Sequence, residues 1–504
     1  MFPDFKTFSQ LSQKYSLVPT FLERTADLET PVTVYLKVGI SKPYSALLES
    51  VEGLESLARH SFIAVSHHFR FESLGSEVRL FSPGKNSSTK EILMEKKKQV
   101  KPFKELKKFI KKYPAAILPE LPSFCGGAIG YASYDMARNF EKLPQTLESA
   151  LHLPEALFLL TDECIVFDHK KHKLYLIKWN LIKDKSQNNL LKLYKTAEKS
   201  LNTLSGEIKN KKVARFHNKK GNYPSIDKIV SNFSKDEFCK AVVKCKDYIR
   251  AGDVIQTVLS QRFELKTDIN PFQVYRALRM VNPSPYLYYL NLNNFSVAGS
   301  SPEILVRKQG NCATVRPIAG TRRRGKNLQE DLAFEKELIK DEKEKAEHLM
   351  LVDLGRNDLG RCCQSGSVKV ENFMKVERYS HVMHLVSTVN GELEKGKNSF
   401  DLFQACFPAG TVTGAPKIRA MEIIEELEKI RRGLYAGSVG YFSYSGDMDM
   451  AITIRTILFN KKKIYMQAGA GIVADSIPER EEKETRSKVT ALFKAVELAQ
   501  SGNL

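Results

Sequence analysis

The chain has 504 residues, of which 42% are hydrophobic and 27% charged, the composition of a globular protein large enough for two domains. No stretch is apolar over the length that spans a bilayer, and residues 1–10 contain no apolar signal-peptide segment, so we expect a cytoplasmic protein without a membrane partner. The eight cysteines are scattered, which is typical of reduced thiols rather than a disulfide framework.

The 78 basic residues exceed the 58 acidic ones, and the resulting formal charge of +20 raises the hypothesis of a nucleic-acid-binding protein. However, the densest lysine runs, at residues 96–98, 107–112 and 209–220, contain few aromatic side chains and resemble solvated surfaces. We therefore expect no nucleic-acid partner and keep nucleic-acid binding as the third alternative for the function.

Three regions of the chain differ in their patterning. Residues 1–208 mix helical and strand patterns, residues 209–222 are polar and basic, and residues 223–504 are rich in strands. We interpret them as an N-terminal domain, a linker or surface excursion, and a second domain. A capping box at Ser234–Glu237 predicts the first helix of the second domain. Because strands and helices do not alternate regularly there, the pattern favours an α+β fold with large antiparallel sheets.

Several elements of the second domain can be predicted one by one. Residues 331–354 have the pattern of a single long helix. Asn390-Gly391 predicts a turn directly after a strand. Strand patterns occupy residues 297–307, 313–318, 382–389, 437–444, 451–459 and 463–467.

Four glutamates form two E-x-x-E pairs, Glu344 with Glu347 and Glu481 with Glu484. Residues three apart share one face of a helix, so each pair aims two carboxylates in one direction. Such oxygens suit Mg²⁺, which keeps several water ligands. The face that carries Glu344 and Glu347 becomes apolar at Leu351, which indicates that these carboxylates point inward. A solvated helix face is the alternative interpretation of either pair.

Two features indicate a site for a small anion. Arg455 lies in the middle of the strand pattern 451–459, where a buried guanidinium needs either a protein carboxylate or an anionic ligand as its partner. Gly469-Ala470-Gly471 follows a strand pattern, and we expect its backbone N–H groups to form an anion-binding nest. A capping box at Ser476–Glu479 then predicts a helix that presents Lys488 beside this nest.

Two further residues are candidates for chemistry. His381 and His384 have the spacing of a zinc pair, but they lie on a predicted strand, where residues three apart face opposite sides, so we expect no zinc. His384 is a candidate for acid–base chemistry near neutral pH, and a purely structural histidine is the alternative. The run 409–417 lacks the spacing of a phosphate loop, and we expect a tight turn that presents Thr411.

Taken together, these segments resemble the chorismate-utilising enzymes and, among them, the large subunits of the anthranilate synthases. The resemblance implies large antiparallel sheets in a sandwich flanked by helices. Leu47–Ser50 and Asn282–Tyr286 resemble the tryptophan feedback site of the family. The other matching segments follow the family's order: Ser301–Glu303, Pro317–Thr321, Glu347–Leu354, Arg356–Asp358, Gly410–Lys417, Gly469–Gly471 and Glu484–Arg486.

The resemblance also implies roles for individual residues. Mg²⁺ would be held by Glu347 and Glu484, with Glu344 and Glu481 close by. The residues expected to contact chorismate are Gly320, Thr321, Tyr435, Arg455, Lys488 and the backbone of Gly469, Ala470 and Gly471. The residues expected to bind the inhibitor L-tryptophan between the sheets are Ser50, Pro285, Tyr286 and Leu287.

In the implied reaction, ammonia adds at C2 of the chorismate ring while the C4 hydroxyl leaves. Elimination of pyruvate then gives anthranilate, the first step of tryptophan biosynthesis. Glu303 is the implied general acid for the leaving hydroxyl. His384 and Thr411 are implied in the elimination, where His384 either moves the proton or orients the intermediate.

Two positions separate the branches of the family. Aminodeoxychorismate synthases carry a nucleophilic lysine where this chain has Ala319, and isochorismate and salicylate synthases carry a lysine base near the position of Gln256. A methyl group cannot attack C2 and an amide cannot deprotonate water, so we expect ammonia as the nucleophile and keep aminodeoxychorismate or isochorismate synthase as the second alternative. The sequence has no glutaminase nucleophile motif, so the expected ammonia source is a glutamine amidotransferase subunit in a heterotetramer.

Overall fold

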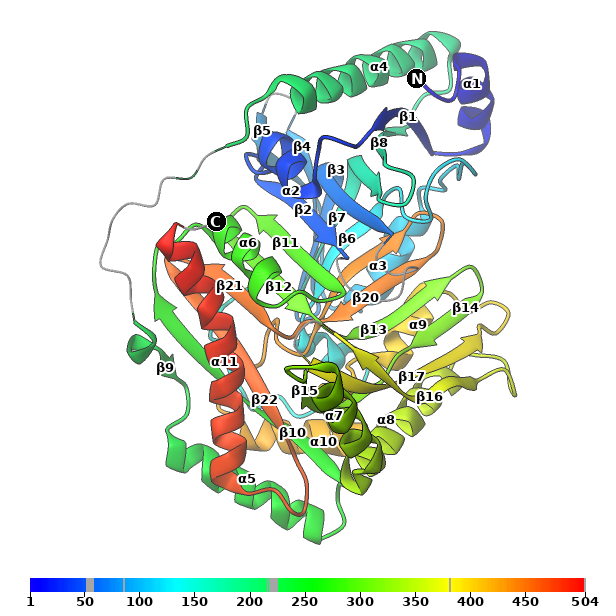
Figure 1. The fold of residues 1–504 in the computed structure, drawn as a ribbon. Coiled ribbons are helices and arrows are strands. Elements are labelled where there is room, and N and C mark those ends of the chain that lie inside the picture. The colour runs from blue at the N-terminus through cyan, green and yellow to red at the C-terminus, as the bar shows by residue number, and fades with distance from the viewer. Residues whose placement is uncertain (51–58, 85–86, 215, 217–224, 380–381, 503–504) are drawn as a thin grey trace.

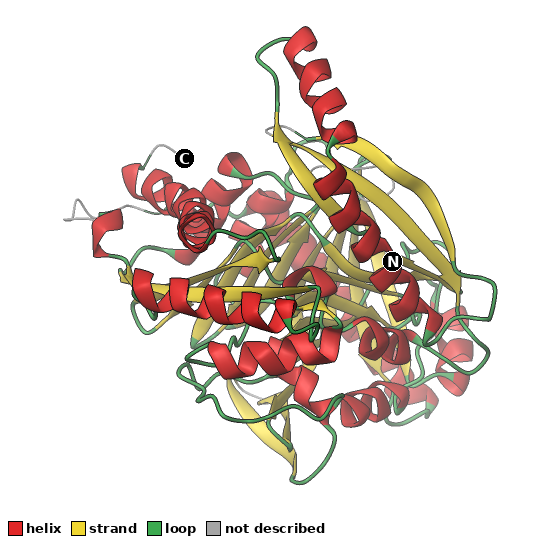
Figure 2. Ribbon diagram, turned by 90° about the horizontal axis from the view of Figure 1, so that it is seen from below, coloured by secondary structure: helices red, strands yellow, loops and turns green. Residues whose placement is uncertain are grey.

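The computed structural model describes residues 1–50, 59–84, 87–214, 216, 225–379 and 382–502. Layers of strands occupy the interior and helices surround them (Figures 1 and 2). Every pair of neighbouring strands in the described chain is antiparallel. The predicted α+β fold with large antiparallel sheets flanked by helices is confirmed. None of the described helices is both long and apolar enough to cross a membrane.

The helices lie mostly on the outside of the strands. They are α1 (Phe5–Lys14), α2 (Pro31–Val34), α3 (Pro102–Lys111), α4 (Gln187–Asn210), α5 (Lys235–Arg250), α6 (Pro271–Val281), α7 (Leu328–Lys340), α8 (Glu342–Gly360), α9 (Ser399–Cys406), α10 (Lys417–Leu427) and α11 (Pro478–Ser501), with short irregular helical turns at Tyr35–Gly39, Tyr134–Asn139, Ile226–Lys228 and Gly410–Val412.

The strands form one hydrogen-bonded network. They are β1 (Leu17–Thr25), β2 (Tyr44–Glu49), β3 (His60–Leu74), β4 (Glu77–Gly84), β5 (Ser87–Lys97), β6 (Gly127–Ala132), β7 (Ala156–Asp168), β8 (Lys173–Leu181), β9 (Val230–Ser231), β10 (Gln256–Lys266), β11 (Tyr286–Leu292), β12 (Phe295–Ser301), β13 (Ile304–Gln309), β14 (Cys312–Val315), β15 (Ile318–Arg323), β16 (Lys369–Arg378), β17 (Val382–Glu392), β18 (Gly414–Ala415), β19 (Ser438–Ser443), β20 (Met448–Ile452), β21 (Thr456–Asn460) and β22 (Lys463–Ile472).

The first 208 residues share this network with the rest of the chain. Strand β2 pairs with β11, with Leu48 opposite Tyr288, and β6 pairs with β19, with Gly130 opposite Gly440. Residues 209–210 of the predicted linker form the end of α4, and residues 215 and 217–222, half of the linker, lie outside the described residues. The division into domains at 1–208 and 223–504 stays a prediction.

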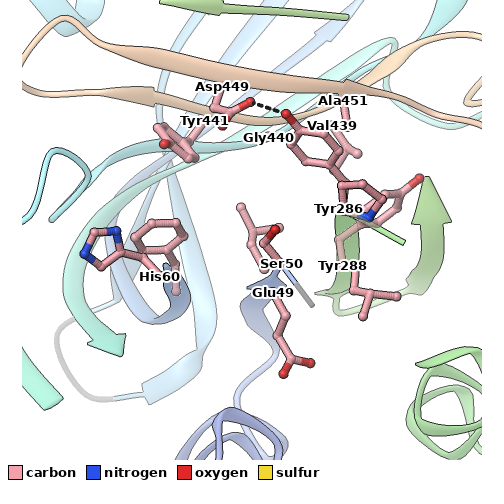
Figure 3. A pocket seen from close by; sticks show the side chains of 14 residues that line it. Glu49, Ser50, His60, Tyr286, Tyr288, Val439, Gly440, Tyr441, Asp449 and Ala451 are labelled. Atoms are coloured by element: carbon pink, nitrogen blue, oxygen red, sulfur yellow. Dashed lines mark hydrogen bonds between the residues drawn. The ribbon is translucent and has the colours of Figure 1, made fainter. Parts of the chain in front are cut away.

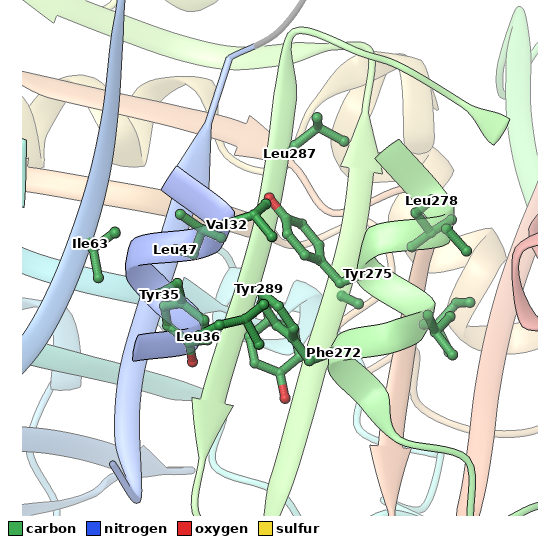
Figure 4. Packing of buried hydrophobic residues seen from close by; sticks show 14 of the residues in the cluster. Val32, Tyr35, Leu36, Leu47, Ile63, Phe272, Tyr275, Leu278, Leu287 and Tyr289 are labelled. Carbon is green, nitrogen blue, oxygen red and sulfur yellow. The ribbon is translucent and has the colours of Figure 1, made fainter. Parts of the chain in front are cut away.

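A buried aromatic cluster fastens α6 to the strands. The ring of Phe272 stacks on Tyr35 at a centroid distance of 5.0 Å, and both rings meet Tyr289 edge-on (Figure 4). Each fully buried ring of this kind contributes about 1.5–3 kcal/mol to folding. Because α6 is held along its length, the chain leaves it in a defined direction and enters β11 at Tyr286.

Helix α11, drawn in red in Figure 1, packs against α5, α6 and β22. Its buried face includes Val489, Leu492 and Phe493, and Glu484 and Lys488 on another face are exposed. The amphipathic pattern thus directs two charged side chains away from the core.

The predicted start of α5 is confirmed and the predicted long helix is wrong. Ser234 and Glu237 form the capping box of α5. Residues 331–354 are divided between α7 and α8, because the carboxylate of Asp341 accepts hydrogen bonds from the backbone N–H groups of Lys343 and Glu344, both at 3.1 Å, and so caps a new helix.

Two strand predictions and one turn prediction also need correction. The pattern 297–307 is broken between β12 and β13, at Pro302, which has no N–H to donate. The pattern 313–318 is likewise split, into β14 and β15. Asn390-Gly391 does not turn but continues β17, because β14 offers these residues strand partners.

Candidate active site

The first residue of β10 contacts the first glutamate pair. The amide Nε2 of Gln256, a side chain that is 4% exposed, donates a hydrogen bond to Oε1 of Glu347 on α8 at 3.2 Å. On the neighbouring strand, a Cβ at Gly471 would lie 2.7 Å from the same Nε2 atom. Glycine at position 471 therefore leaves the space in which β10, β22 and α8 meet.

The predicted nest at Gly469-Ala470-Gly471 is wrong, because the three residues lie inside β22 with extended backbone. On one side they pair with residues 258–260 of β10. On the other side, the pairing of β21 with β22 ends at Met466, so no described strand covers residues 469–471 there. A Cβ at Gly469 would lie 2.6 Å from the hydroxyl of Tyr435, which places that hydroxyl against this edge. Burial raises the pKa of Tyr435 to about 12.

The second glutamate pair approaches β22 from α11. Lys488 Nζ donates to the carbonyl of Gly469 at 2.9 Å and forms an ion pair with Glu484 at 2.7 Å. Burial and the nearby Glu484 raise the pKa of Glu481. The helix begins at Pro478 after Ile477, so the predicted capping box at Ser476 is wrong, because the Ser476 hydroxyl instead accepts a bond from the N–H of Val473 at 3.1 Å.

Helix α8 brings the first glutamate pair to β15. Burial, and secondarily the charge of Glu347, raise the pKa of Glu344, while its ion pair with Arg322 at 3.2 Å opposes the shift. Gly320 has a φ of +62°, and a Cβ there would lie 3.3 Å from Oε2 of Glu344. Glycine is thus required both by the backbone and by the carboxylate beside it.

His384 on β17 lies beside Gly320 and Thr321. Its Nδ1 is 3.0 Å from the Gly320 carbonyl, an acceptor, so Nδ1 carries the proton, and 3.1 Å from Oγ1 of Thr321. Burial and the positive charge of Arg455 lower the pKa of His384. The imidazole is therefore neutral at pH 7, and no described residue occupies its Nε2, which is free to accept a proton.

The prediction that Arg455 lies inside a strand is wrong. The residue lies in the break between β20 and β21, with a φ of +49°. Its guanidinium donates a hydrogen bond to Oδ1 of Asn282 at 3.0 Å. No carboxylate of the described residues forms an ion pair with it, so it has no internal salt bridge there. The Arg455 side chain is in part exposed to solvent, whereas protein surrounds its guanidinium group. This partial burial lowers the pKa of Arg455.

Glu303 and Thr411 face each other in a cavity between α8 and the turn Gly410–Val412. Burial raises the pKa of Glu303 to about 7. The nearby Thr411 hydroxyl opposes this shift, and its Oγ1 is buried without a hydrogen-bond partner among the described residues. The predicted turn at Thr411 is confirmed.

One buried ion pair of the site was not predicted from the sequence. Arg432 and Glu428, which are 2% and 4% exposed, pair at 2.7 Å. The Arg432 guanidinium also donates to the carbonyls of Val412 and Val258 at 2.6 Å and lies over the ring of Tyr435. The spacing of four residues was visible in the sequence, but it is equally typical of an exposed helix pair.

The four predicted inhibitor residues line one cavity that is open to solvent (Figure 3). Ser50 lies on one wall, and its Oγ is buried without a partner in the described chain. Pro285, Tyr286 and Leu287 lie on another wall, and the Tyr286 hydroxyl donates to Asp449 at 3.1 Å. The sequence motifs at Ser50 and Tyr286, far apart in the chain, are brought together by the pairing of β2 with β11.

Comparison with known proteins decides the family. Residues 68–494 match the family model of the chorismate binding enzymes. The chain belongs to this family. Within it, the chain is 45% identical to anthranilate synthase component 1 of Acetivibrio thermocellus over 99% of both chains, and 45% identical to that of Aquifex aeolicus over 97% of both. This chorismate-binding enzyme therefore belongs with the anthranilate synthase component I proteins, as its motifs predicted.

Solved structures with the same fold agree. The crystal structure of anthranilate synthase component I from Streptococcus pneumoniae has a TM-score of 0.73 and 36% identity, with 93% of this chain and 98% of that chain covered. The menaquinone-specific isochorismate synthase of Escherichia coli has a TM-score of 0.70 over 98% of both chains, but at 17% identity it shares the fold alone.

Proposed function

We propose that this protein is the large subunit of anthranilate synthase and converts chorismate and ammonia into anthranilate and pyruvate. The observation that carries this function is Arg455, whose guanidinium has no carboxylate partner among the described residues and lies beside the neutral imidazole of His384. A cation without a counter-ion next to a free base suits a substrate that brings its own carboxylate.

The enolpyruvyl carboxylate of chorismate binds Arg455, the Tyr435 hydroxyl and the open backbone edge of Gly469–Gly471. Lys488 adds a second cation next to that edge. The ring lies against Gly320 and Thr321, next to His384. The described contacts join these groups in two sets, Arg455 with His384, Gly320 and Thr321, and Tyr435 with Gly469 and Lys488. In the proposed complex, chorismate bridges the two sets.

The two glutamate pairs fit Mg²⁺. Glu347 and Glu484 each have one carboxylate oxygen bonded to a neighbour, and no described residue binds the other oxygen. Two such oxygens, with water and a substrate carboxylate, satisfy a cation that is rarely enclosed by protein ligands alone. Among the described residues no cluster of three His, Cys, Asp or Glu side chains could hold a metal without a substrate. When bound, Mg²⁺ supplies a positive charge that withdraws electrons from the ring.

The residues of the chain account for the proton transfers. Glu303, whose pKa is raised to about 7, is still partly protonated at neutral pH and gives its proton to the C4 hydroxyl, which leaves as water while ammonia bonds to C2. Nε2 of His384 then takes the C2 proton, and the electron pair of the C2–H bond completes the aromatic ring as the C3–O bond breaks. The enolate of pyruvate leaves and takes a proton on its methylene carbon to become pyruvate. Thr411, beside Glu303, lies next to the same ring.

Two neutral residues distinguish this activity from that of the sister enzymes. Gln256 donates to Glu347 where a base would be needed to activate water, and Ala319 offers no amine for a covalent step. Aminodeoxychorismate or isochorismate synthase activity is the second candidate. Ammonia comes from a glutamine amidotransferase subunit in a heterotetramer, in the cytoplasm, and L-tryptophan bound at Ser50 and Pro285–Leu287 inhibits the enzyme.

The test is to incubate the chain with chorismate, Mg²⁺ and an ammonium salt at mildly alkaline pH. Fluorescent anthranilate is expected, whereas aminodeoxychorismate or isochorismate as the product would identify a sister enzyme. Chelator should abolish turnover, and Glu347→Gln and Glu484→Gln should each lower it strongly. Normal, chelator-resistant turnover in these variants would exclude Mg²⁺. Millimolar tryptophan should inhibit the parent, and untouched activity would exclude the feedback role of the cavity.

A further inference from the structure

The segments Arg356–Asp358 and Gly410–Lys417 meet in one buried ion pair. Asp358 lies in the last turn of α8, Lys417 is the first residue of α10, and both side chains are 10% exposed. The two carboxylate oxygens of Asp358 accept hydrogen bonds from Lys417 Nζ at 2.9 and 2.8 Å. Nζ also donates to the carbonyl of Cys406, the last residue of α9, at 3.3 Å, which accounts for its three protons. One ammonium group thus joins three helices.

This ammonium group closes a loop that carries Thr411. Cys406 and Lys417 stand at the two ends of the segment 407–416, which contains the turn Gly410–Val412. Because Lys417 bonds to the Cys406 carbonyl, the two ends of the loop are held together. The position of Thr411 therefore depends on how this closed loop is placed against its neighbours.

One side of the loop rests on α8, and on the other side its strand β18 pairs with the start of β10. A Cβ at Gly410 would lie 1.9 Å from Cδ2 of Leu354, one turn of α8 before Asp358, so the loop packs directly on the helix. Within the described part of the chain, no hydrogen bond joins the segment 407–416 to α8. The ion pair of Lys417 with Asp358 is therefore the polar contact that fixes the loop to this helix.

The same ion pair borders the cavity of the proposed general acid. Asp358 and Cys406 line this cavity together with Glu303 and Thr411. The Thr411 hydroxyl has no hydrogen-bond partner among the described residues, so the backbone of the loop decides where it lies. The charged atoms of Asp358 and Lys417 are bonded to each other, which suits a role in holding the loop rather than in contacting the substrate.

We propose that Asp358 and Lys417 are positioning residues for Thr411, and that their ion pair closes the loop 407–416 and fixes it to α8. This inference rests on the proposed function, in which Thr411 lies beside the reacting ring. Helix α8 also carries the first glutamate pair, so the ion pair keeps the hydroxyl in register with the proposed metal ligands. A displacement of about 1 Å at a reacting centre can lower the rate about 100-fold.

The first test is Lys417→Met in the full-length protein. It should lower kcat about 10- to 100-fold and leave the KM for chorismate within about 3-fold of the parent. The matched control is Lys37→Met, because Lys37 is also a buried lysine whose Nζ donates to one carboxylate, that of Glu29, and to one backbone carbonyl, that of Ile208 at 2.8 Å. Both variants should lower the urea midpoint, but only Lys417→Met should lower kcat. Equal kcat in the two variants would overturn the proposal.

A merely structural role is tested by combining Asp358→Asn with Lys417→Met. The double variant leaves no buried charge without its partner, so its urea midpoint should recover relative to Lys417→Met alone. The asparagine and methionine side chains cannot restore the ion pair, and kcat should stay low. Recovery of kcat together with the midpoint would show that the pair only stabilises the fold.

Action through Thr411 is tested by a double-mutant cycle with Thr411→Val. In this background, Lys417→Met should lower kcat by less than about 3-fold, because the hydroxyl that the ion pair positions is gone. If Lys417→Met lowers kcat by its full factor in the Thr411→Val protein, the ion pair does not act through Thr411 and the proposal is wrong.

Hydrogen exchange tests the closed loop without any substrate. Peptides that cover residues 407–416 should exchange about 10-fold or more faster in Lys417→Met than in Lys37→Met. Equal exchange in the two variants would overturn the role of the ion pair. A protein that shows the difference in exchange, but whose parent forms no anthranilate, would overturn the proposed function alone.

Discussion

The amide of Gln256 donates a hydrogen bond to the carboxylate of Glu347, and this bond joins the first residue of β10 to the second turn of α8. This bond leaves the second carboxylate oxygen of Glu347 free. It also places a neutral amide at a position where a lysine could act as a base and activate water. A Cβ at position 471 would lie 2.7 Å from the same amide nitrogen, so glycine at this position leaves room for the Gln256 side chain.

Replacing Gln256 by lysine should therefore weaken the enzyme. The ammonium group would pair with Glu347 and repel Mg²⁺, so the Mg²⁺ concentration for half-maximal activity should rise about 10- to 100-fold, as for other groups that orient a metal ligand. Titration of activity with Mg²⁺ measures this shift. The control Gln256→Met has similar volume and no charge, and its shift should be smaller. Equal Mg²⁺ dependence of the lysine variant and the parent would contradict the assignment.

Glu303→Gln should remove the general acid and lower the rate about 100-fold or more. In the parent, kcat should fall as the pH rises through about 7, where Glu303 loses its proton. The variant should lack this alkaline limb. A parent profile without a limb near pH 7, or a variant that keeps it, would show that another group supplies the proton.

The same carboxyl affects stability, and the sign follows from its pKa. Because the folded pKa of about 7 lies above the ordinary value of 4.5, the unfolded state ionises first as the pH rises. The folded state then loses up to about 3 kcal/mol between these two pH values. Urea unfolding should find Glu303→Gln more stable than the parent above pH 7 and equal to it below pH 4. Equal stability at pH 8 would contradict the raised pKa.

His384→Met should block the second half of the reaction. The neutral imidazole has its Nε2 free, and methionine cannot accept the proton. Chorismate should still be consumed, while anthranilate formation falls about 100-fold or more and the aminated intermediate accumulates. Liquid chromatography of the products measures the ratio, with the exposed His172→Met as the control. Anthranilate formation at the parent rate would show that His384 has no role in elimination.

Arg432→Met should destabilise the protein by about 3–5 kcal/mol, because it leaves the buried Glu428 carboxylate without its cation. The urea midpoint measures the loss. Lys463→Met, which breaks a partly exposed pair with Glu264, should hardly shift the midpoint. Adding Glu428→Leu to Arg432→Met should recover part of the stability. If Arg432→Met were as stable as the Lys463→Met control, the buried pair of Arg432 and Glu428 would contribute nothing to stability.

Local signals predicted the elements that depend on neighbours in the chain. The capping box at Ser234 correctly predicted the start of α5, because each of its hydrogen bonds spans only three residues. The break at Arg455 was missed because it depends on a distant partner, and the break at Asp341 was missed although the cap that starts α8 there is local. Asp341 also pairs with Arg322 on β15 at 2.7 Å, and Arg455 is held by Asn282, 173 residues away.

By itself, the sequence determined the family, the α+β class and the types of side chain available for chemistry, because these follow from motifs and composition. Only the tertiary structure decided which groups meet. The register of β10 against β22 brings Gln256 to Glu347, and the ends of α6 and β20 bring Asn282 to Arg455. Such meetings depend on packing between segments far apart in the chain, and no local pattern encodes them.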